Sequence, residues 1–262
     1  MSAFNDLSNL CPTLVIDLQA AESASETSPA VALDKLADWV PLLIRVILAF
    51  EGIDEPADGN PSISMNRLNN RGLLPAALLP FFDLLSAHDP LSGLSESAIR
   101  MRAKISMKIA SRLAIWFLKS YGPYLPPEVS SASNDNALVQ AVREVPPTDG
   151  QRRSARKTAL QRAATMQLTE EETRVIIDHQ LRSVGWQADT GSLRYSNGTR
   201  PEKNANKAIA EWHTESGPAD YALFAGLDFI GVIEAKKMGK DVLSDLTQSK
   251  RYSRDALLDG QA

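Results

Sequence analysis

The sequence predicts an all-α N-terminal region followed by a small α/β domain. Between Val31 and Tyr121, apolar residues recur at steps of three and four, which is the period of a helix with one buried face. After Leu168 the pattern changes to one helix, two strand-like runs and a final helix. That order is typical of a small α/β domain.

The composition limits the class of protein. Of the 262 residues, 44% are hydrophobic and 23% are charged, which excludes a wholly disordered or collagen-like chain and leaves enough apolar material for a core. The apolar run from Trp39 to Phe50 is too short to span a bilayer and is interrupted by Pro41 and Arg45. The N-terminus has no basic segment followed by an apolar one, so no secretory signal is visible. We therefore expect a soluble cytoplasmic protein without membrane contacts.

The domain organisation follows from changes in composition. Residues 1–30 end in a Ser-, Ala- and Glu-rich stretch and are expected to be a mobile leader. Residues 31–122 are expected to be a helical accessory domain whose loops contain Gly and Pro. Residues 123–165 are predicted to be a linker that ends in a basic segment. For this segment an exposed helix or tether is favoured over an arm that contacts phosphates.

Charge is distributed unevenly between the two halves. Residues 1–150 carry a net charge of −6 and residues 151–262 a net charge of +2. An acidic protein lacks the surface field that non-specific DNA binding needs, so we expect weak, salt-sensitive DNA binding by this chain alone. The acidic helical region is expected to be a packing or protein-docking module.

Candidate site residues gather in the predicted α/β domain. Asp220 follows a Gly-Pro pair and opens a strand-like run, and a hairpin through Gly226 would bring it within reach of Glu234. Glu234 and Lys236 are two apart and would point to the same face of a strand. Charged groups directly after an apolar run cost free energy unless they are paired or bind a metal. Two carboxylates and a lysine at one strand end suit Mg²⁺, because this ion prefers a few carboxylates with water and phosphate.

The motifs TEEETRVIIDHQLRSVGW, GPADYALF, GVIEAKK and QSKRY, in this order, resemble the N-terminal nuclease domain of type I restriction enzyme R subunits, in the PD-(D/E)xK superfamily. The resemblance covers roughly residues 168–252. It implies a restriction-endonuclease-like mixed sheet flanked by helices over residues 166–262, and Mg²⁺-dependent cleavage of double-stranded DNA as a site-specific deoxyribonuclease in defence against foreign DNA. Modification and specificity subunits are the implied partners. ATP would be used only by motor domains outside this chain, because no phosphate loop of the GxxxxGK[ST] type is present.

The resemblance also assigns roles to individual residues. It makes Asp220 and Glu234 metal ligands, with the backbone carbonyl of Ala235 as a further ligand, and it makes Lys236 the catalytic lysine. The remaining residues implied in orienting the site or following the DNA backbone are Gln248, Arg251 and Tyr252. One departure is the sequence Pro-Ala-Asp where the superfamily has Pro-Asp.

The family has an acidic residue on its first helix, and Glu170, Glu171 and Glu172 all compete for that role. Thr169 and Glu172 have the spacing of a capping box, which gives Glu172 a structural function. Glu170 lies at helical spacing with Arg174, on the stripe expected to face the packed side. Glu170 is therefore the favoured candidate.

A second interpretation is a catalytically silent nuclease-fold module that docks within a larger DNA-processing complex. Taken alone, Glu-x-Lys is common surface charge, Asp220 could be a turn residue, and His213 and Glu211 are minor candidates for the site. An inert copy would be expected to have lost an acidic residue or the lysine, so the intact set favours the enzyme. Because the family continues into a further strand and a motor, we expect this chain to be an N-terminal fragment of a longer subunit.

Overall fold

The computed structural model describes residues 3–56, 59–86, 91, 93–214 and 217–235. The chain divides into two compact units, here named the helical unit (residues 1–90 and 100–166) and the sheet unit (residues 91–99 and 167–262). The division after Met166 lies one residue from the domain start expected at 166. At this level the prediction of helices followed by a small α/β domain is confirmed.

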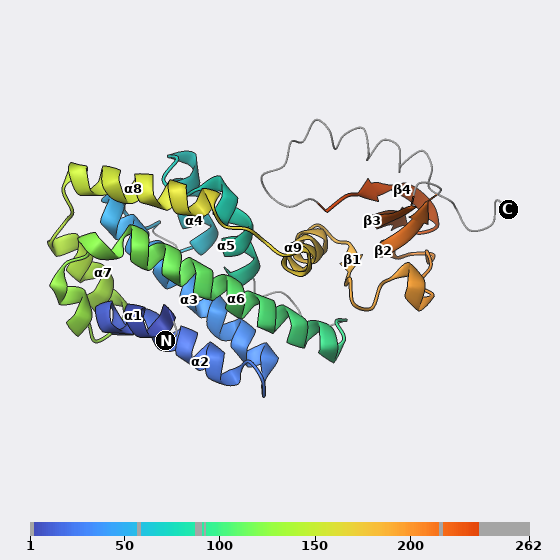
Figure 1. The fold of residues 1–262 in the computed structure, drawn as a ribbon, viewed down its shortest axis with the longest axis horizontal. Helices are drawn as coiled ribbons and strands as arrows, with labels where there is room; N and C mark the ends of the chain where they lie inside the picture. Colours follow the sequence, from blue (N-terminus) through green and yellow to red (C-terminus); the bar gives the residue numbers. More distant parts are fainter. Residues whose placement is uncertain (1–2, 57–58, 87–90, 92, 215–216, 236–262) are drawn as a thin grey trace. The chain divides into compact units, whose positions relative to one another are not determined.

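The helical unit is built from α-helices joined by short loops and 3₁₀ turns (Figure 1). In chain order the helices are α1 (Ala3–Leu10), α2 (Ile16–Ala24), α3 (Pro29–Glu51), α4 (Pro61–Asn70), α5 (Leu79–Ser86), α6 (Glu96–Ser120, from residue 100 onward in this unit), α7 (Asp135–Glu144) and α8 (Asp149–Ala164). Among the described helices, none has the length and apolar character needed to cross a membrane.

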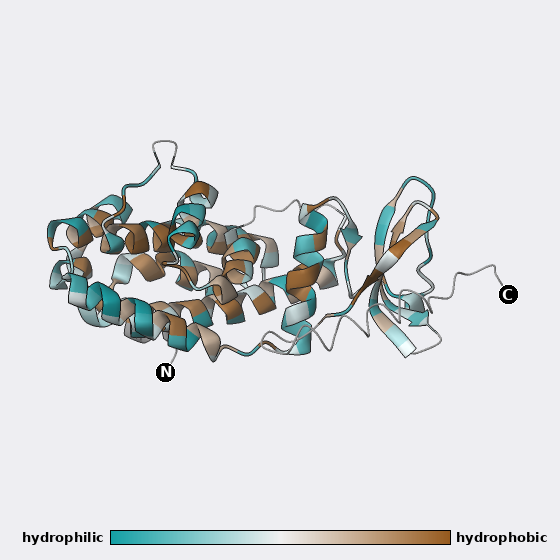
Figure 2. Ribbon diagram, turned by 90° about the horizontal axis from the view of Figure 1, so that it is seen from above, coloured by the Kyte–Doolittle hydropathy of each residue, from teal (hydrophilic) through white to brown (hydrophobic). Residues whose placement is uncertain are grey.

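The core of the helical unit is centred on α3, against which α2, α5 and α7 pack. Figure 2 shows the hydrophobic residues, in brown, gathered towards the inside of this unit. The core includes an aromatic cluster: the ring of Tyr121 lies 5.1 Å from that of Phe50, 5.6 Å from that of Trp116 and 5.5 Å from that of Phe117, measured between centroids. Such large buried rings contribute much of the apolar area that stabilises a helical core.

The expectation of a mobile leader over residues 1–30 is wrong. This segment forms α1, a 3₁₀ turn and α2, and it buries Leu7, Leu14 and Leu18 completely. The Thr13 hydroxyl also donates to the carbonyl of Ala132 at 2.7 Å. The Ser- and Glu-rich composition describes only the end of the segment, whereas its leucines have the spacing of a packed face.

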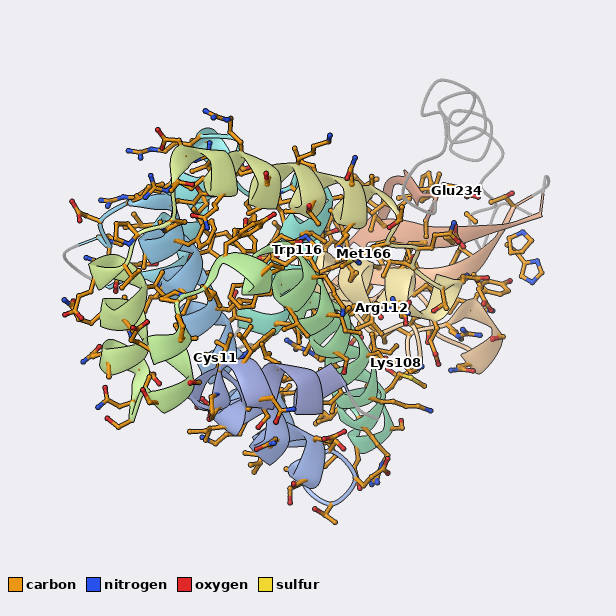
Figure 3. The ribbon with its side chains drawn as sticks, turned by 60° about the vertical axis from the view of Figure 1, so that its left-hand side comes forward. Cys11, Lys108, Arg112, Trp116, Met166 and Glu234 are labelled. Carbon is orange, nitrogen blue, oxygen red and sulfur yellow. The ribbon has the colours of Figure 1, made fainter. Side chains whose placement is uncertain are left out.

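The expectation of a linker over residues 123–165 is also wrong. The segment contains two 3₁₀ turns, α7 and α8, and α8 buries Ala155, Ala159 and Ala163 at steps of four. The indole N–H of Trp116, labelled in Figure 3, donates to the carbonyl of Ala159 at 3.0 Å. Small alanines allow α8 to approach α6 closely, and the five basic residues of the segment hide this apolar stripe from a composition argument.

Two of those basic side chains fasten α8 to the C-terminal end of α3. Arg152 Nε donates to the carbonyl of Phe50 at 3.0 Å. The guanidinium of Arg156 pairs with the carboxylate of Glu51 through both Nε and Nη2, and the Glu51 side chain is fully buried. Cations at a helix C-terminus satisfy its last carbonyls and its dipole. The basic segment is therefore a packed helix rather than a tether.

In its described residues, the sheet unit contains α9 (Glu170–Ser183) and four strands in the order β1 (Gln187–Ala188), β2 (Asn206–Thr214), β3 (Gly217–Ala225) and β4 (Asp228–Ile233). β1 runs parallel to β2, and the other neighbours are antiparallel, so the sheet is mixed. β3 and β4 were expected from their apolar runs. β1 and β2 were not expected. In β2, Lys, Glu and His alternate irregularly with the apolar residues and hide the strand pattern. The helix expected over residues 240–258 lies outside the described residues.

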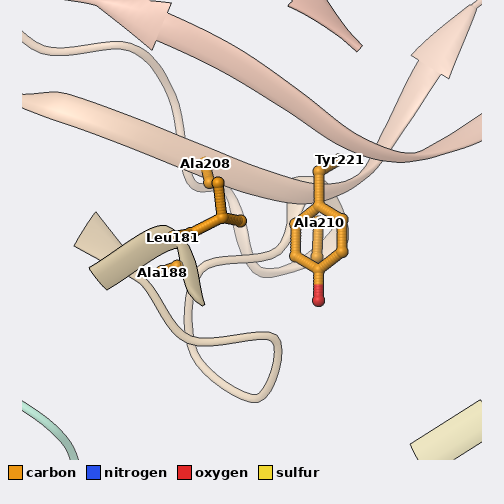
Figure 4. Packing of buried hydrophobic residues seen from close by; sticks show 5 residues of the cluster. All are labelled: Leu181, Ala188, Ala208, Ala210 and Tyr221. Atoms are coloured by element: carbon orange, nitrogen blue, oxygen red, sulfur yellow. The ribbon is translucent and has the colours of Figure 1, made fainter. Parts of the chain in front are cut away.

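Each face of the sheet carries its own small core. On one face, Leu181 of α9 packs with Ala188, Ala208, Ala210 and Tyr221 (Figure 4). On the other face the cluster consists of Ile209, Trp212, Ala222 and Phe224, with Tyr195 and Phe229 packed against it. Alanines beneath α9 let the helix lie close to the strands, which sets where its side chains stand relative to those of β2 and β3.

Candidate functional site

The β3–β4 hairpin brings Asp220 to the segment that contains Glu234. Tyr221 is paired with Ile233, so Asp220 and Glu234 are the next residues along the two strands. The backbone N–H of Ala235 donates to Asp220 Oδ2 at 2.7 Å. Gly226 forms the turn with a φ of +64°, a conformation that glycine adopts without strain. The predicted hairpin through Gly226 is confirmed.

The centre of the site is occupied by a guanidinium group. Arg174 Nη2 lies 2.9 Å from Asp220 Oδ1, 3.0 Å from Glu170 Oε1 and 3.9 Å from Glu211 Oε1. The three carboxylates come from three elements: β3, the first turn of α9, and β2. The Arg174 side chain is only 11% exposed. One cation therefore ties three parts of the sheet unit together at one point.

Burial and the neighbouring charges determine the pKa values of Asp220 and Arg174. Burial raises the pKa of Asp220, and Glu170 and Glu211 act in the same direction, although the Ala235 N–H and Arg174 oppose them. For Arg174, burial acts to lower the pKa, but Asp220 and Glu170 outweigh it and the pKa lies above its ordinary value. Arg174 therefore remains a full positive charge at any physiological pH.

Glu170 reaches the site differently from what its spacing predicts. Its side chain is 72% exposed rather than turned to the packed side. It joins the site through its i,i+4 pair with Arg174. Glu172, by contrast, is buried in the predicted capping box: its N–H donates to Thr169 Oγ1 at 3.2 Å, and its Oε2 accepts from the Thr169 N–H at 2.9 Å. That structural role is confirmed.

Glu211 has an unusual backbone conformation. Its φ is +53°, in the left-handed region that a residue with a Cβ seldom adopts. The pairs on either side, Ala210 with Tyr221 and Trp212 with Ala219, place it across from Asp220. Its other carboxylate oxygen accepts from Arg194 Nη1 at 3.0 Å. Strained backbone is often found at functional sites, and here it directs a carboxylate to Arg174.

A buried polar network next to the site was not anticipated from the sequence. Asp178 accepts from the Thr190 N–H at 2.8 Å, from the Thr190 hydroxyl at 2.9 Å and from the Tyr221 hydroxyl at 3.0 Å. Figure 4 shows the Tyr221 hydroxyl pointing away from its strand on the side of Leu181. Burial raises the pKa of Asp178, against the effect of these donors. The available signal was Asp178 lying three residues before Leu181 and four after Arg174, on the packed face of α9.

The described side chains fit a divalent cation in chemistry but not yet in arrangement. Carboxylates are the ligands that Mg²⁺ prefers, and those of Asp220, Glu170 and Glu211 already surround a cation. Among the residues that the structure describes, however, no three His, Cys, Asp or Glu side chains are placed to hold a metal ion. The position between the carboxylates is taken by Arg174.

Of the remaining predicted site residues, the structure describes Glu234 and Ala235. Glu234, labelled in Figure 3, directly follows β4. Lys236, Gln248, Arg251 and Tyr252 lie outside the described residues, so their roles stay predictions. For Ala235 the structure shows its N–H bound to Asp220, and the role of its carbonyl as a ligand stays a prediction.

The strands of this site are similar to a known protein family. Residues 187–262 match the family described as the second domain of the type I restriction enzyme EcoKI endonuclease subunit. The endonuclease subunit of the type I restriction enzyme EcoKI from Escherichia coli (strain K12) is 53% identical over 96 residues, which cover 34% of this chain and 8% of that protein. This region resembles a type I restriction endonuclease subunit.

The resemblance predicted from the sequence motifs is thus confirmed for this region, which includes Asp220 and Glu234. The aligned stretch spans a small part of the relative's length, and the family match begins at residue 187, after the helical unit. No solved structure matches the chain.

Proposed function

We propose that the sheet unit is the Mg²⁺-dependent endonuclease part of a type I restriction enzyme subunit, which hydrolyses phosphodiester bonds of double-stranded DNA in defence against foreign DNA. The observation that carries this proposal is the hydrogen bond from the Ala235 N–H to Asp220 across the β3–β4 hairpin, which joins the two acidic motifs. It lies within the region that matches the endonuclease subunit family.

In this proposal the acidic residues of the chain bind and orient the metal ion. Asp220 and Glu234, with the Ala235 carbonyl, would hold Mg²⁺, which when bound supplies an activated water and offsets charge on phosphorus. The Ala235 N–H fixes one oxygen of Asp220 and so sets the direction of the other.

The positively charged and polar side chains would act on the substrate. Lys236 would orient the attacking water or take its proton, and its charge would stabilise the negative charge that builds up on the phosphate. Gln248, Arg251 and Tyr252 would contact the DNA backbone, and Glu170 would act on the site through Arg174. We further propose the PD-(D/E)xK fold and a cytoplasmic location. Modification and specificity subunits would bring most of the DNA affinity, because this chain is acidic.

The test is DNA cleavage by the complete restriction complex assembled with a variant of this subunit. Asp220→Asn is expected to lower the Mg²⁺-dependent cleavage rate by more than about 100-fold, because a metal ligand and the charge it supplies are lost. Lys236→Ala is expected to abolish cleavage without loss of fold. Asp228→Asn, at the exposed start of β4, removes the same charge from the same sheet and is expected to leave the rate unchanged.

Cleavage at a near wild-type rate by Asp220→Asn would overturn the proposal. If the variant complex also assembled normally, the sheet unit would be a docking module with a nuclease-like sequence. Circular dichroism of each variant separates a loss of chemistry from a loss of fold.

A further inference from the structure

We propose that Arg174 is a positioning residue that occupies the cation position of the site until a divalent metal ion displaces it, and so sets the metal affinity. The inference rests on the proposed function and deepens it. It starts from a single atom: Nη2 of Arg174 contacts carboxylates of Asp220, Glu170 and Glu211. Three acidic side chains converging on one nitrogen define a place built for positive charge.

Asp220 is fully engaged in this arrangement. Its Oδ2 accepts from the Ala235 N–H at 2.7 Å and its Oδ1 accepts from Arg174 at 2.9 Å. A divalent ion on Asp220 would stand within a few ångströms of the guanidinium. Like charges at that separation repel strongly in a partly buried site. Metal and guanidinium therefore compete for the same carboxylate.

The net charge of the cluster favours replacement of the Arg174 guanidinium by a divalent ion. Three carboxylates face two guanidinium groups, those of Arg174 and Arg194, so this cluster has one negative charge in excess. A divalent ion in place of a monovalent group neutralises that excess.

Arg174 is also held in a way that permits release. Its Nε and Nη2 are bound, but its Nη1 is buried and has no hydrogen-bond partner among the described residues. A buried donor without a partner costs free energy, so leaving the site relieves a cost. Glu170 lies one helical turn away and is 72% exposed, so it offers the guanidinium a partner nearer to solvent.

The experiment is a calorimetric titration of the full chain with Mn²⁺, which serves as the probe for the divalent ion. Arg174→Gln is expected to bind Mn²⁺ about 30-fold more tightly than wild type, because a unit positive charge about 4 Å from a divalent ion weakens its binding by roughly that factor even in water. Mn²⁺ should also raise the melting temperature of this variant more than that of wild type. Arg182→Gln is the matched control, because it removes the same charge from the same helix at a side chain that donates to the Ala188 carbonyl. Its affinity should not change.

Arg174→Lys keeps the charge but replaces the guanidinium, which binds through both Nε and Nη2, with a single amine. Its Mn²⁺ affinity is expected to lie between those of wild type and Arg174→Gln. It also serves as the second variant if Arg174→Gln fails to fold. Equal or weaker Mn²⁺ binding by a folded Arg174 variant overturns this inference and leaves the proposed nuclease standing. If no variant binds Mn²⁺, with or without DNA, both this inference and the metal site of the proposed function fail. Added Asp220→Asn should remove the tight binding of Arg174→Gln, and binding that persists would place the metal elsewhere.

Discussion

In the helical unit Arg156 pairs with one buried carboxylate, that of Glu51, whereas in the sheet unit Arg174 is shared among three. The first pair is balanced, and it joins α8 to the end of α3 across 105 positions of sequence. The second cluster carries excess negative charge and lies where the first turn of α9 meets β2 and β3. A balanced pair stabilises an arrangement of helices, while an unbalanced cluster keeps capacity for a further cation.

Asp178 adds a third case to this comparison. It is a buried carboxylate of the sheet unit, but its hydrogen-bond donors are the neutral groups of Thr190 and Tyr221. The molecule thus holds a fully buried carboxylate with one arginine, a buried carboxylate with neutral donors, and three partly exposed carboxylates around a shared arginine. The three arrangements predict different costs when they are disrupted.

The largest effect on stability is expected for Arg156→Ala. The substitution leaves the Glu51 carboxylate buried without its cation, which should lower the free energy of unfolding of the helical unit by about 3 kcal/mol. Amide hydrogen exchange of the α3 and α8 peptides measures this loss. Arg153→Ala removes the same charge from the exposed face of α8 and should change stability by less than about 0.5 kcal/mol. Equal effects of the two variants would show that the Glu51 pair does not stabilise the unit.

An intermediate effect is expected for Asp178→Ala. The buried donors of Thr190 and Tyr221 lose their acceptor, which should lower the free energy of unfolding of the sheet unit by about 2 kcal/mol. Exchange of the amides of α9 and β3 reports the change. Asp228→Ala, at an exposed position, is the control. A loss larger than that of Arg156→Ala would reverse the order that the comparison predicts.

The smallest effect concerns the backbone of Glu211. Because its φ is +53°, glycine should be more stable than alanine at this position by about 1 kcal/mol. Urea unfolding of Glu211→Gly and Glu211→Ala measures the difference, since both lack the carboxylate. At Lys207, on the same strand with ordinary backbone, alanine should be the more stable of the two. An alanine preference at both positions would mean that Glu211 is not strained.

Local patterns in the sequence predicted the features that depend on neighbouring residues. The capping box of Thr169 and Glu172 and the turn at Gly226 follow from short spacings, and both are present. The hairpin then determined that Asp220 would meet the Glu234 segment, because strand register follows from the turn.

Features that depend on distant residues could not be predicted in this way. Arg174, Glu211 and Asp220 come together only when α9 lies against the sheet, and no spacing between them indicates this. The same holds for α8, whose alanine stripe can be recognised as a packed face only when its contact with Trp116 is known. β2 was missed because three of its side chains carry charge or imidazole, and their partners lie on other elements.

Tyr221 directly follows Asp220 in β3. Its hydroxyl binds Asp178 and also lies 2.7 Å from the Thr190 hydroxyl. A shift of β3 along its axis by even a fraction of a residue would break these buried hydrogen bonds. The backbone of β3 is therefore held in one position. Adjustment of the site to an incoming ligand must then come from torsions of the Asp220 and Arg174 side chains. The main-chain amides of β3 should keep the same slow solvent exchange whether the site is empty or filled.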